Sequence, residues 1–231
     1  ESNLRAFLPN PYPPLLNRPI IDDMLSCSLS CQRLPQAFYQ RDSITVARAL
    51  LGQKLVRVHR GKRLAGMIVE TEAYLGMADQ AAHTYKGRRT TRNQSMWQAG
   101  GIAYVYFTYG MHFCVNVVAG DCDQPIAVLI RALEPLEGLE QMYQNRIKAR
   151  KDQDLCSGPA KLCQALAIDR KLDGVHLITS SHLFLEKLRD RTYQQQKIGV
   201  SPRIGIPNSG LWKDKPLRFF IRRNSHVSRP S

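Results

Sequence analysis

The stretch Ile102-Ala-Tyr-Val-Tyr-Phe-Thr-Tyr-Gly-Met-His-Phe-Cys-Val-Asn-Val-Val118 contains two runs of β-branched and aromatic residues, which are separated by Tyr109-Gly110. Such runs are typical of strands, and a short connection that contains glycine is typical of a hairpin turn. The sequence therefore predicts a β-hairpin of strands 102–108 and 111–118. A large aromatic side chain at its tip is costly to leave in water, so Tyr109 either folds back onto the domain or contacts a partner.

Further strands and helices are expected on both sides of this hairpin. Alternating or continuous apolar runs predict strands, and apolar residues at three- and four-residue spacing predict helices. Asp42 or Ser43 can cap the first helix, and Ser157 can cap the last, with Pro159 in its first turn. We expect strands at 53–59, 64–71 and 125–132, helices at 44–51, 136–150 and 160–166, and short strands after residue 174.

The length and the distribution of prolines indicate one folded domain with an arm. The chain has 231 residues, of which 43% are hydrophobic, so it can bury a sizeable core. Residues 1–35 carry six prolines and no sustained periodicity, which predicts a largely irregular arm with one short helix near residues 21–29. We expect the domain over residues 36–223 and a flexible tail over 224–231.

The charge indicates a polyanionic partner. The net charge is +14 and the isoelectric point is about 9.8. Nucleic acid is favoured because basic surfaces gain affinity by releasing counterions from phosphates. A membrane surface is disfavoured, since the sequence has no long apolar run and no basic amphipathic helix. An acidic protein remains an alternative partner.

The six cysteines do not resemble a disulfide framework or a metal site. They are sparse, and several lie within apolar runs, as reduced core thiols do. The Cys27-x3-Cys31 pair has no Cys/His partner pair at zinc-finger spacing, so we expect no zinc there. The first residues also lack a basic region followed by an apolar run, so no secretory signal is expected.

Two carboxylates end the expected strand Ile68-Val-Glu-Thr-Glu-Ala-Tyr74. Alternation along a strand places Glu70 and Glu72 on one face, and an unpaired buried carboxylate costs several kcal/mol. The face is therefore either solvent-exposed or part of a site. Arg131, at the end of the strand expected at 125–132, is either a partner of these glutamates or a surface residue whose charged head reaches solvent.

A long polar stretch follows Glu72. Residues 72–92 show no periodicity and include His83 and four bases, at positions 86, 88, 89 and 92. Long loops in compact domains tend to be functional. Ser157-Gly158-Pro159 with Lys161 is a weaker signal, an anion site at the start of a helix.

Several motifs, in order, resemble the alkyladenine (3-methyladenine) DNA glycosylase family. The resemblance covers roughly residues 38–222. The matching segments are Glu70-Thr-Glu-Ala-Tyr74, Ala81-Ala-His83, Thr90-x-Arg92-Asn93-x-x-Met96, Tyr104-x-Tyr106-x-x-Tyr109-Gly-Met111 with Asn116, Leu129-Ile-Arg131-Ala-Leu-Glu-Pro135, Cys156-Ser-Gly-Pro-Ala-Lys-Leu162, Arg203-Ile-Gly-Ile206 and Pro216-Leu-Arg-Phe219.

The resemblance implies a single compact α+β domain with a curved, mainly antiparallel sheet flanked by helices and a hairpin that protrudes toward DNA. It implies a monofunctional, monomeric DNA N-glycosylase that uses no metal and no other cofactor. Its partner would be double-stranded DNA containing a damaged purine, with downstream repair proteins as possible further partners. The place of action would be the nucleus, or the cytoplasm and nucleoid of a bacterium.

The resemblance also assigns roles to residues. Glu72 would activate water, which Arg131 and the Ile204 carbonyl help to hold. Tyr74, His83 and Tyr106 would sandwich the flipped base, Asn116 would disfavour normal guanine, and Tyr109 would be inserted into the duplex. Contacts with the DNA backbone are expected from Arg88, Thr90, Arg92, Met96, Ser157 and Lys161.

These roles agree with the chemistry of the residues. A carboxylate near the sugar both activates water and stabilises an oxocarbenium-like state, and aromatic faces attract a cationic alkylated base. No lysine falls on the pocket positions, which argues against a Schiff-base lyase step. Two alternatives remain: a catalytically silent protein that binds damaged DNA, and an RNA-binding module with the same basic surface. Glu70 is interpreted as structural.

Overall fold

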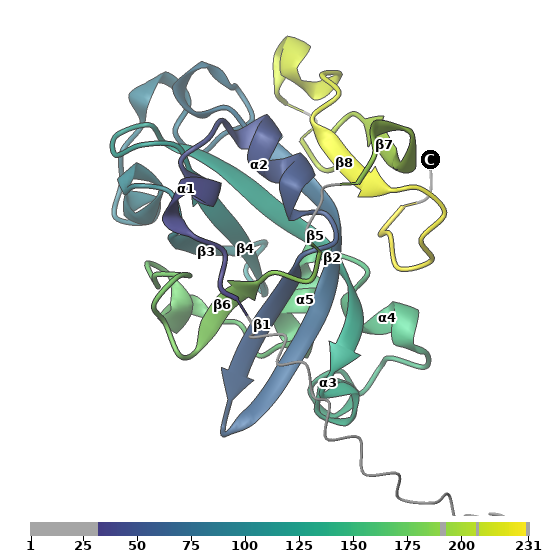
Figure 1. The fold of residues 1–231 in the computed structure, drawn as a ribbon. Helices are drawn as coiled ribbons and strands as arrows, with labels where there is room; N and C mark the ends of the chain where they lie inside the picture. The colour runs from purple at the N-terminus through teal and green to yellow at the C-terminus, as the bar shows by residue number, and fades with distance from the viewer. Residues whose placement is uncertain (1–31, 190–192, 207, 230–231) are drawn as a thin grey trace, which may run out of the picture. The chain divides into compact units, whose positions relative to one another are not determined.

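The protein was analysed as a computed structural model, which describes residues 32–189, 193–206 and 208–229 (Figure 1). The expected arm, except for residues 32–35, and its expected helix near 21–29 lie outside the described residues. Within the described part, Arg33 forms a bridge with Glu186, and Leu34 is buried.

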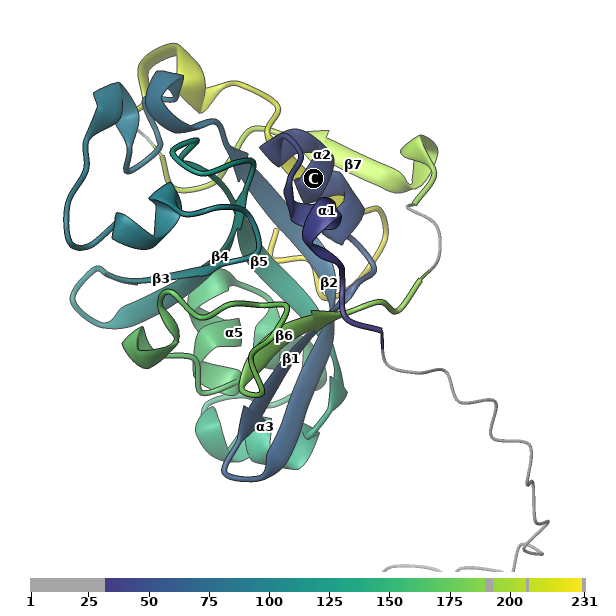
Figure 2. The ribbon, with the colours of Figure 1, turned by 60° about the vertical axis from the view of Figure 1, so that its left-hand side comes forward.

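One antiparallel sheet of eight strands organises the domain. Its main path has the order β3-β4-β5-β2-β1-β6, and β8 pairs with both β2 and β7. The strands are β1 (Lys54–His59), β2 (Lys62–Tyr74), β3 (Ala103–Thr108), β4 (His112–Ala119), β5 (Ile126–Glu137), β6 (Leu183–Glu186), β7 (Ile198–Ser201) and β8 (Arg218–Ile221). The turned view in Figure 2 shows the curl of the sheet. The expected α+β class with a curved antiparallel sheet is confirmed.

Short helices and 3-10 turns flank this sheet. The helices are α1 (Gln36–Tyr39), α2 (Ser43–Leu50), α3 (Leu139–Asn145), α4 (Asp152–Cys156) and α5 (Pro159–Ala165). The 3-10 turns are η1 (Gly76–Ala78), η2 (Tyr85–Gly87), η3 (Gln94–Trp97), η4 (Arg170–Leu172), η5 (Gln195–Lys197) and η6 (Gly210–Lys213). As expected, the Asp42 side chain caps α2 by accepting from the Thr45 amide at 2.9 Å. Helix α2 packs on β2 and β5, and α5 packs on β4 and β5.

The central strand β2 positions much of the site. It pairs with β1, β5 and β8, and its register with β5 shifts on both sides of Glu70. Such β-bulges re-aim side chains and are common beside active sites. Strand β2 continues to Tyr74, three residues beyond the expected end at Thr71.

The helix expected over 136–150 was too long. Strand β5 continues through Glu137, because residues 133–137 pair with β2. Gly138 then adopts a left-handed conformation (φ 77°) and precedes the short helix α3. The last expected helix is present as α5, but its N-cap is Gly158, and no side chain caps it. The Ser157 cap was therefore wrong.

The segment expected as a flexible tail packs against the sheet over its described residues 224–229. Val227 and His226 are buried, and Asn224 donates to Glu134 at 2.7 Å. This segment is held by apolar packing and also by hydrogen bonds, because Ser228 donates to the buried Glu70.

Candidate active site

A cavity of about 480 Å³ opens between the β3–β4 hairpin, strand β5, the connecting segment 80–83 and the residues 204–206 and 208–209. This volume lies within the range of small-molecule sites. Its lining includes every residue that we expected in the base pocket: Tyr74, His83, Tyr106 and Asn116. Arg131, Ile204 and Tyr109 also line it, together with Tyr104, which the sequence analysis did not assign.

Aromatic rings form one wall of the cavity. The rings of Tyr104 and Tyr106 stack at 5.2 Å between centroids, and His83 meets Tyr106 edge to face at 4.6 Å. The Nδ1 atom of His83 lies 2.7 Å from the Tyr104 hydroxyl. Although one face of His83 stays open to solvent, the cavity walls remove part of its hydration, and Arg92 and Arg88 oppose its protonation. Together they lower the pKa of His83 to about 4, so this imidazole is neutral near pH 7.

Asn116 adds a fixed polar group to the same wall. It lies on β4 opposite Tyr104 of β3, is buried, and its Nδ2 donates to the Tyr104 carbonyl at 3.1 Å. The hydrogen bond sets the direction of the amide, whose other polar atom remains available to a molecule in the cavity.

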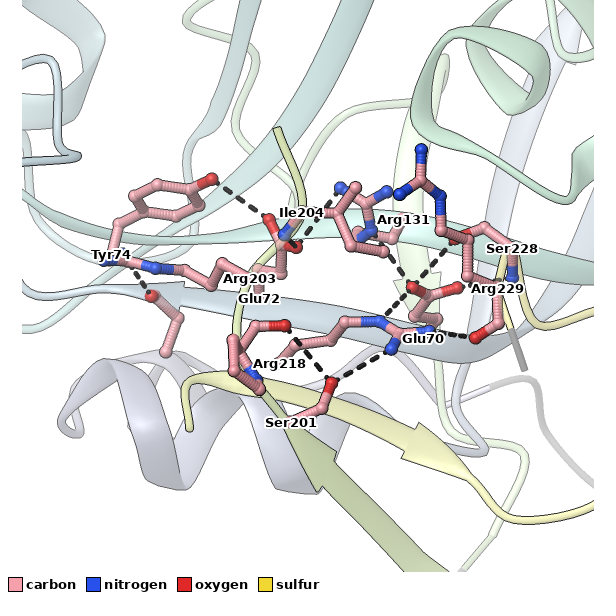
Figure 3. Close-up of polar contacts among 12 residues, drawn as sticks. Glu70, Glu72, Tyr74, Arg131, Ser201, Arg203, Ile204, Arg218, Ser228 and Arg229 are labelled. Atoms are coloured by element: carbon pink, nitrogen blue, oxygen red, sulfur yellow. Dashed lines mark hydrogen bonds and ion pairs between the residues drawn. The ribbon is translucent and has the colours of Figure 1, made fainter. Parts of the chain in front are cut away.

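Glu72 lies behind three residues that line the cavity (Figure 3). Its Oε1 accepts from the Ile204 amide at 2.7 Å and lies 3.2 Å from Nη1 of Arg131, and its Oε2 accepts from the Tyr74 hydroxyl at 3.0 Å. The side chain of Glu72 is fully buried. Burial raises the pKa of Glu72, and Arg131, the Ile204 amide and the Tyr74 hydroxyl lower it in part. Of the two alternatives for this strand face, solvent exposure is excluded, because Glu70 and Glu72 are both buried.

Arg131 connects the two glutamates. It lies in the middle of β5 and is buried, not at a strand end as expected. Its Nε is 3.0 Å from Glu70, while its Nη1 faces Glu72. Arg218 of β8 contacts the same oxygen of Glu70 at 2.6 Å. Two carboxylates and two guanidinium groups thus neutralise one another in the interior, as buried charges require.

A second buried ion pair fixes the two segments that frame the cavity. Arg203 contacts both carboxylate oxygens of Asp79, one of them at 2.9 Å, and neither side chain is exposed. Arg203 also donates to the Ala73 carbonyl at 3.0 Å, and its guanidinium lies 4.6 Å from the centre of the Tyr74 ring. The pair therefore holds Tyr74 and the neighbouring Ile204 in place.

Tyr109 lies at the turn of the β3–β4 hairpin, as predicted, and borders the cavity. Tyr109 is 79% exposed and also contributes to the cavity lining. Tyr109 and Gly110 both have positive φ (51° and 67°), and the Met111 amide donates to the Thr108 carbonyl at 3.2 Å. Positive φ at both central residues is the geometry of a type I′ turn. The turn directs Tyr109 away from the core, so this side chain does not fold back.

The residues expected to contact the DNA backbone differ in their exposure to solvent. Arg88, Arg92 and Lys161 are exposed, and Thr90 and Ser157 are half-buried. The guanidinium of Arg92 lies 5.3 Å from the Tyr106 ring centre, and Ser157 and Lys161 flank Pro159, which lines the cavity.

Met96, which is also expected to contact the DNA backbone, lies in the buried turn η3 beside the cavity. Its side chain is 2% exposed and packs with Trp97 and Tyr104, because η3 directs it inward. Its amide already donates to the Asn93 carbonyl at 3.1 Å. Met96 therefore packs against the aromatic wall and is part of the cavity lining, and its contact with DNA stays a prediction.

Sequence reasoning missed several residues that build the site. Arg203 and Arg218 stood within motifs but received no role, and Asp79 and Ser228 were not singled out. A signal existed for Asp79, because it is the only acid in the polar stretch between Glu72 and Arg92. No pattern in the sequence links it to Arg203, which is 124 residues away.

Two features are absent from the described residues, namely a metal-binding cluster and a membrane-spanning helix. No group of three or more His, Cys, Asp or Glu side chains in this part of the chain is arranged to hold a metal ion. None of its helices has the length and apolarity needed to cross a membrane.

Comparison with known proteins agrees with this architecture. A sequence model of the family "Methylpurine-DNA glycosylase (MPG)" matches residues 37–225. The chain is 47% identical over 208 residues to DNA-3-methyladenine glycosylase of Mus musculus, covering 85% of this chain and 61% of that protein. It is 45% identical to the Homo sapiens protein of the same name, with 85% and 68% covered.

Bacterial relatives match over almost their whole length. The putative 3-methyladenine DNA glycosylase of Natranaerobius thermophilus is 44% identical over 197 residues, which are 85% of this chain and 98% of that protein. The chain belongs to the methylpurine-DNA glycosylase family.

Proposed function

We propose that this protein is a monofunctional DNA glycosylase of base excision repair. It flips alkylated or deaminated purines out of duplex DNA and hydrolyses their N-glycosidic bonds, leaving abasic sites. The substrates are 3-methyladenine, 7-methylguanine, hypoxanthine and ethenoadenine. Family membership and the names of the relatives support the activity on 3-methyladenine, and the other three lesions are those that the family resemblance implies.

One observation carries the proposal: a buried carboxylate lies directly behind the lining of an aromatic cavity, at whose rim an exposed tyrosine stands. Glu72 is held by Arg131, Ile204 and Tyr74, all of which line the cavity. Tyr109 at the rim is 79% exposed. A flipped base needs such a pocket, and the gap that it leaves in the duplex needs a side chain to fill it.

Glu72 acts as the general base. Its carboxylate accepts a proton from a water molecule, and the water oxygen bonds to C1′ of the deoxyribose as the bond from C1′ to the base nitrogen breaks. The bonding electron pair leaves with the base. Arg131 and the Ile204 backbone orient the water, and the carboxylate stabilises the positive charge that develops on the sugar.

The cavity walls favour an alkylated or otherwise electron-poor purine. Faces of Tyr74 and Tyr106 attract a cationic base by cation–π interaction, worth about 0.5–2 kcal/mol. Neutral His83 adds no opposing charge and offers hydrogen bonds to the purine edge. Asn116, held in place by its hydrogen bond to Tyr104, disfavours the 2-amino group of guanine by filling the space that this group would need.

The DNA-binding surface surrounds the cavity mouth. Tyr109 enters the duplex, and the exposed bases Arg88, Arg92 and Lys161, with Thr90 and Ser157, contact phosphates. The net charge of +14 supports binding to a polyanion. None of the described residues that line the cavity is a lysine, which supports hydrolysis by water without a covalent lyase step. The protein acts as a monomer in the nucleus, or at the nucleoid if its source is bacterial, and passes the abasic product to downstream repair proteins.

Excision from a hypoxanthine-containing duplex tests the proposal, with Glu72→Gln as the matched control. Gln keeps the size of the side chain but cannot accept the proton, so single-turnover excision should fall about a hundredfold or more while duplex binding is kept. If the wild-type protein binds this duplex and those carrying the other three lesions at saturation but cuts none, it is a silent damage-binding protein. If it prefers RNA and the Glu72→Gln exchange has no effect, the RNA-binding alternative holds.

A further inference from the structure

Ser228, which lies beyond the stretch matched by the family model, contacts a buried carboxylate next to the active site. The family model ends at residue 225, and Ser228 lies three residues further on. The amide of Ser228 donates to Oε2 of Glu70 at 2.6 Å, and its hydroxyl donates to Oε1 at 2.9 Å (Figure 3). A hydroxyl and an amide from one residue thus clasp a buried carboxylate that does not line the cavity.

Glu70 is the residue with which Glu72 shares Arg131. Oε1 of Glu70 accepts hydrogen bonds from Nε of Arg131 at 3.0 Å and from Nε of Arg218 at 2.6 Å. Arg218 is held in turn by the carbonyl of Arg229 at 2.5 Å and by the Ser201 hydroxyl at 3.0 Å. Only the Nη1 end of Arg131 faces Glu72.

We propose that Ser228 is a positioning residue for the reaction: by satisfying Glu70 it keeps Arg131 directed at Glu72. The inference rests on the proposed function and adds to it a residue outside the family match. Glu70 is fully buried, so every donor removed from it must be replaced by another. Arg218 is already fixed by Ser201 and the Arg229 carbonyl, so Arg131 is the donor that adjusts, and its turn toward Glu70 weakens its contact with Glu72.

Loss of the Ser228 hydrogen bonds should change the pKa of Glu72. Arg131 is the largest influence that lowers the pKa of this carboxyl group, so a weaker Arg131 contact raises that pKa. The charged and titratable groups that face Glu72 come from four strands: Arg131 from β5, Glu70 and Tyr74 from β2, Tyr106 from β3 and Cys114 from β4. Among these groups, Glu70 and Arg131 belong to the network that Ser228 completes.

Three substitutions at position 228 separate the effect of losing the hydroxyl from a general effect on folding. Ser228→Ala removes one donor to Glu70, Ser228→Thr keeps it, and Ser228→Asp places a carboxylate against Glu70. The same Ala and Asp exchanges at the exposed Ser225 serve as controls in the same segment. If Ser228→Asp fails to fold, the comparison of Ala with Thr still decides the question.

The pKa of Glu72 is measured by NMR titration of its ¹³C-labelled carboxyl group, and single-turnover excision is measured against pH. For Ser228→Ala we expect a higher Glu72 pKa and excision slowed about three- to tenfold on the acidic limb, as for a pKa rise of up to about one unit. Ser228→Thr should match the wild type. Lesion affinity should stay unchanged in both, because position 228 does not line the cavity.

The inference is overturned if Ser228→Ala and Ser228→Thr show the same Glu72 pKa and the same rate profile, even when Ala lowers the melting temperature. Equal effects of the Ser225 controls overturn it too. If the wild-type protein excises nothing while Ser228→Ala still shifts the Glu72 pKa, the proposed function fails and the link between Ser228 and Glu72 stands.

Discussion

The hydroxyl of Tyr74 donates a 3.0 Å hydrogen bond to Oε2 of Glu72, while the same tyrosine lines the cavity. One side chain therefore serves both the base pocket and the carboxylate, and the two tasks can be separated. Tyr74→Phe keeps the ring and removes the hydrogen bond, which lowers the pKa of Glu72 in the wild type. We expect unchanged lesion binding and an acidic limb of the excision profile at higher pH. A loss confined to binding would contradict this division of tasks.

The pH dependence of the wild type follows from the burial of Glu72. Since its pKa is raised and only the ionised form accepts a proton, activity is present above the raised pKa and is lost as the pH falls through it. The acidic limb should therefore lie above the usual range of a glutamate carboxyl. Single-turnover rates from pH 4 to 8 measure it, and a limb at or below that range would be the contrary result.

Tyr109 should contribute to lesion binding and little to stability. Tyr109→Ser removes an exposed ring, so the melting temperature should stay nearly unchanged, while affinity for a lesion duplex should fall by about 1–3 kcal/mol, the range of a lost base–aromatic stack. Leu211→Ser is the matched control, because Leu211 is 85% exposed but does not line the cavity. Equal effects of the two exchanges would show that the hairpin tip does not enter the duplex.

The Asp79–Arg203 pair should matter far more for folding than an ion pair near the surface. Arg203→Met leaves Asp79 buried without its charge partner, so the free energy of unfolding should fall by about 3–5 kcal/mol. Adding Asp79→Asn to this variant should recover part of the loss. Urea denaturation measures both.

A second ion-pair variant controls for the general cost of losing an arginine. The side chain of Arg89 is 49% exposed and pairs with Asp123, whose side chain is 67% exposed, so Arg89→Met should cost about 1 kcal/mol or less. A loss as large as that of Arg203→Met would remove the distinction between the two pairs.

The elements that sequence reasoning predicted well are those with local causes. The β3–β4 hairpin follows from composition and from a turn in which Gly110 supplies one of two positive φ angles, and the start of α2 follows from the Asp42 cap. The lining positions at Tyr74, His83, Tyr106 and Asn116 came from motifs and are close together in the structure. Their catalytic and binding roles stay predictions.

The misses have non-local causes. Nothing near residue 136 indicates that β5 continues, because that extension depends on pairing with β2, about 70 residues earlier in the chain. Similarly, Glu70 and Glu72 could not be identified as buried, since their partners Arg131, Arg218 and Ser228 come from three distant segments. A tail without periodicity resembles disorder until its hydrogen bonds are known.

The network around Glu70 also implies that the folding chain gains its catalytic activity only when its last segments are in place. Residues 70, 131, 218 and 228 meet only after β8 has paired with β2 and the segment behind it has docked. An intermediate that has formed the β3–β4 hairpin but lacks these last contacts would present the wedge and part of the aromatic wall to DNA, without a correctly charged base. From the proposed function we expect that such an immature chain would sample the duplex without creating abasic sites.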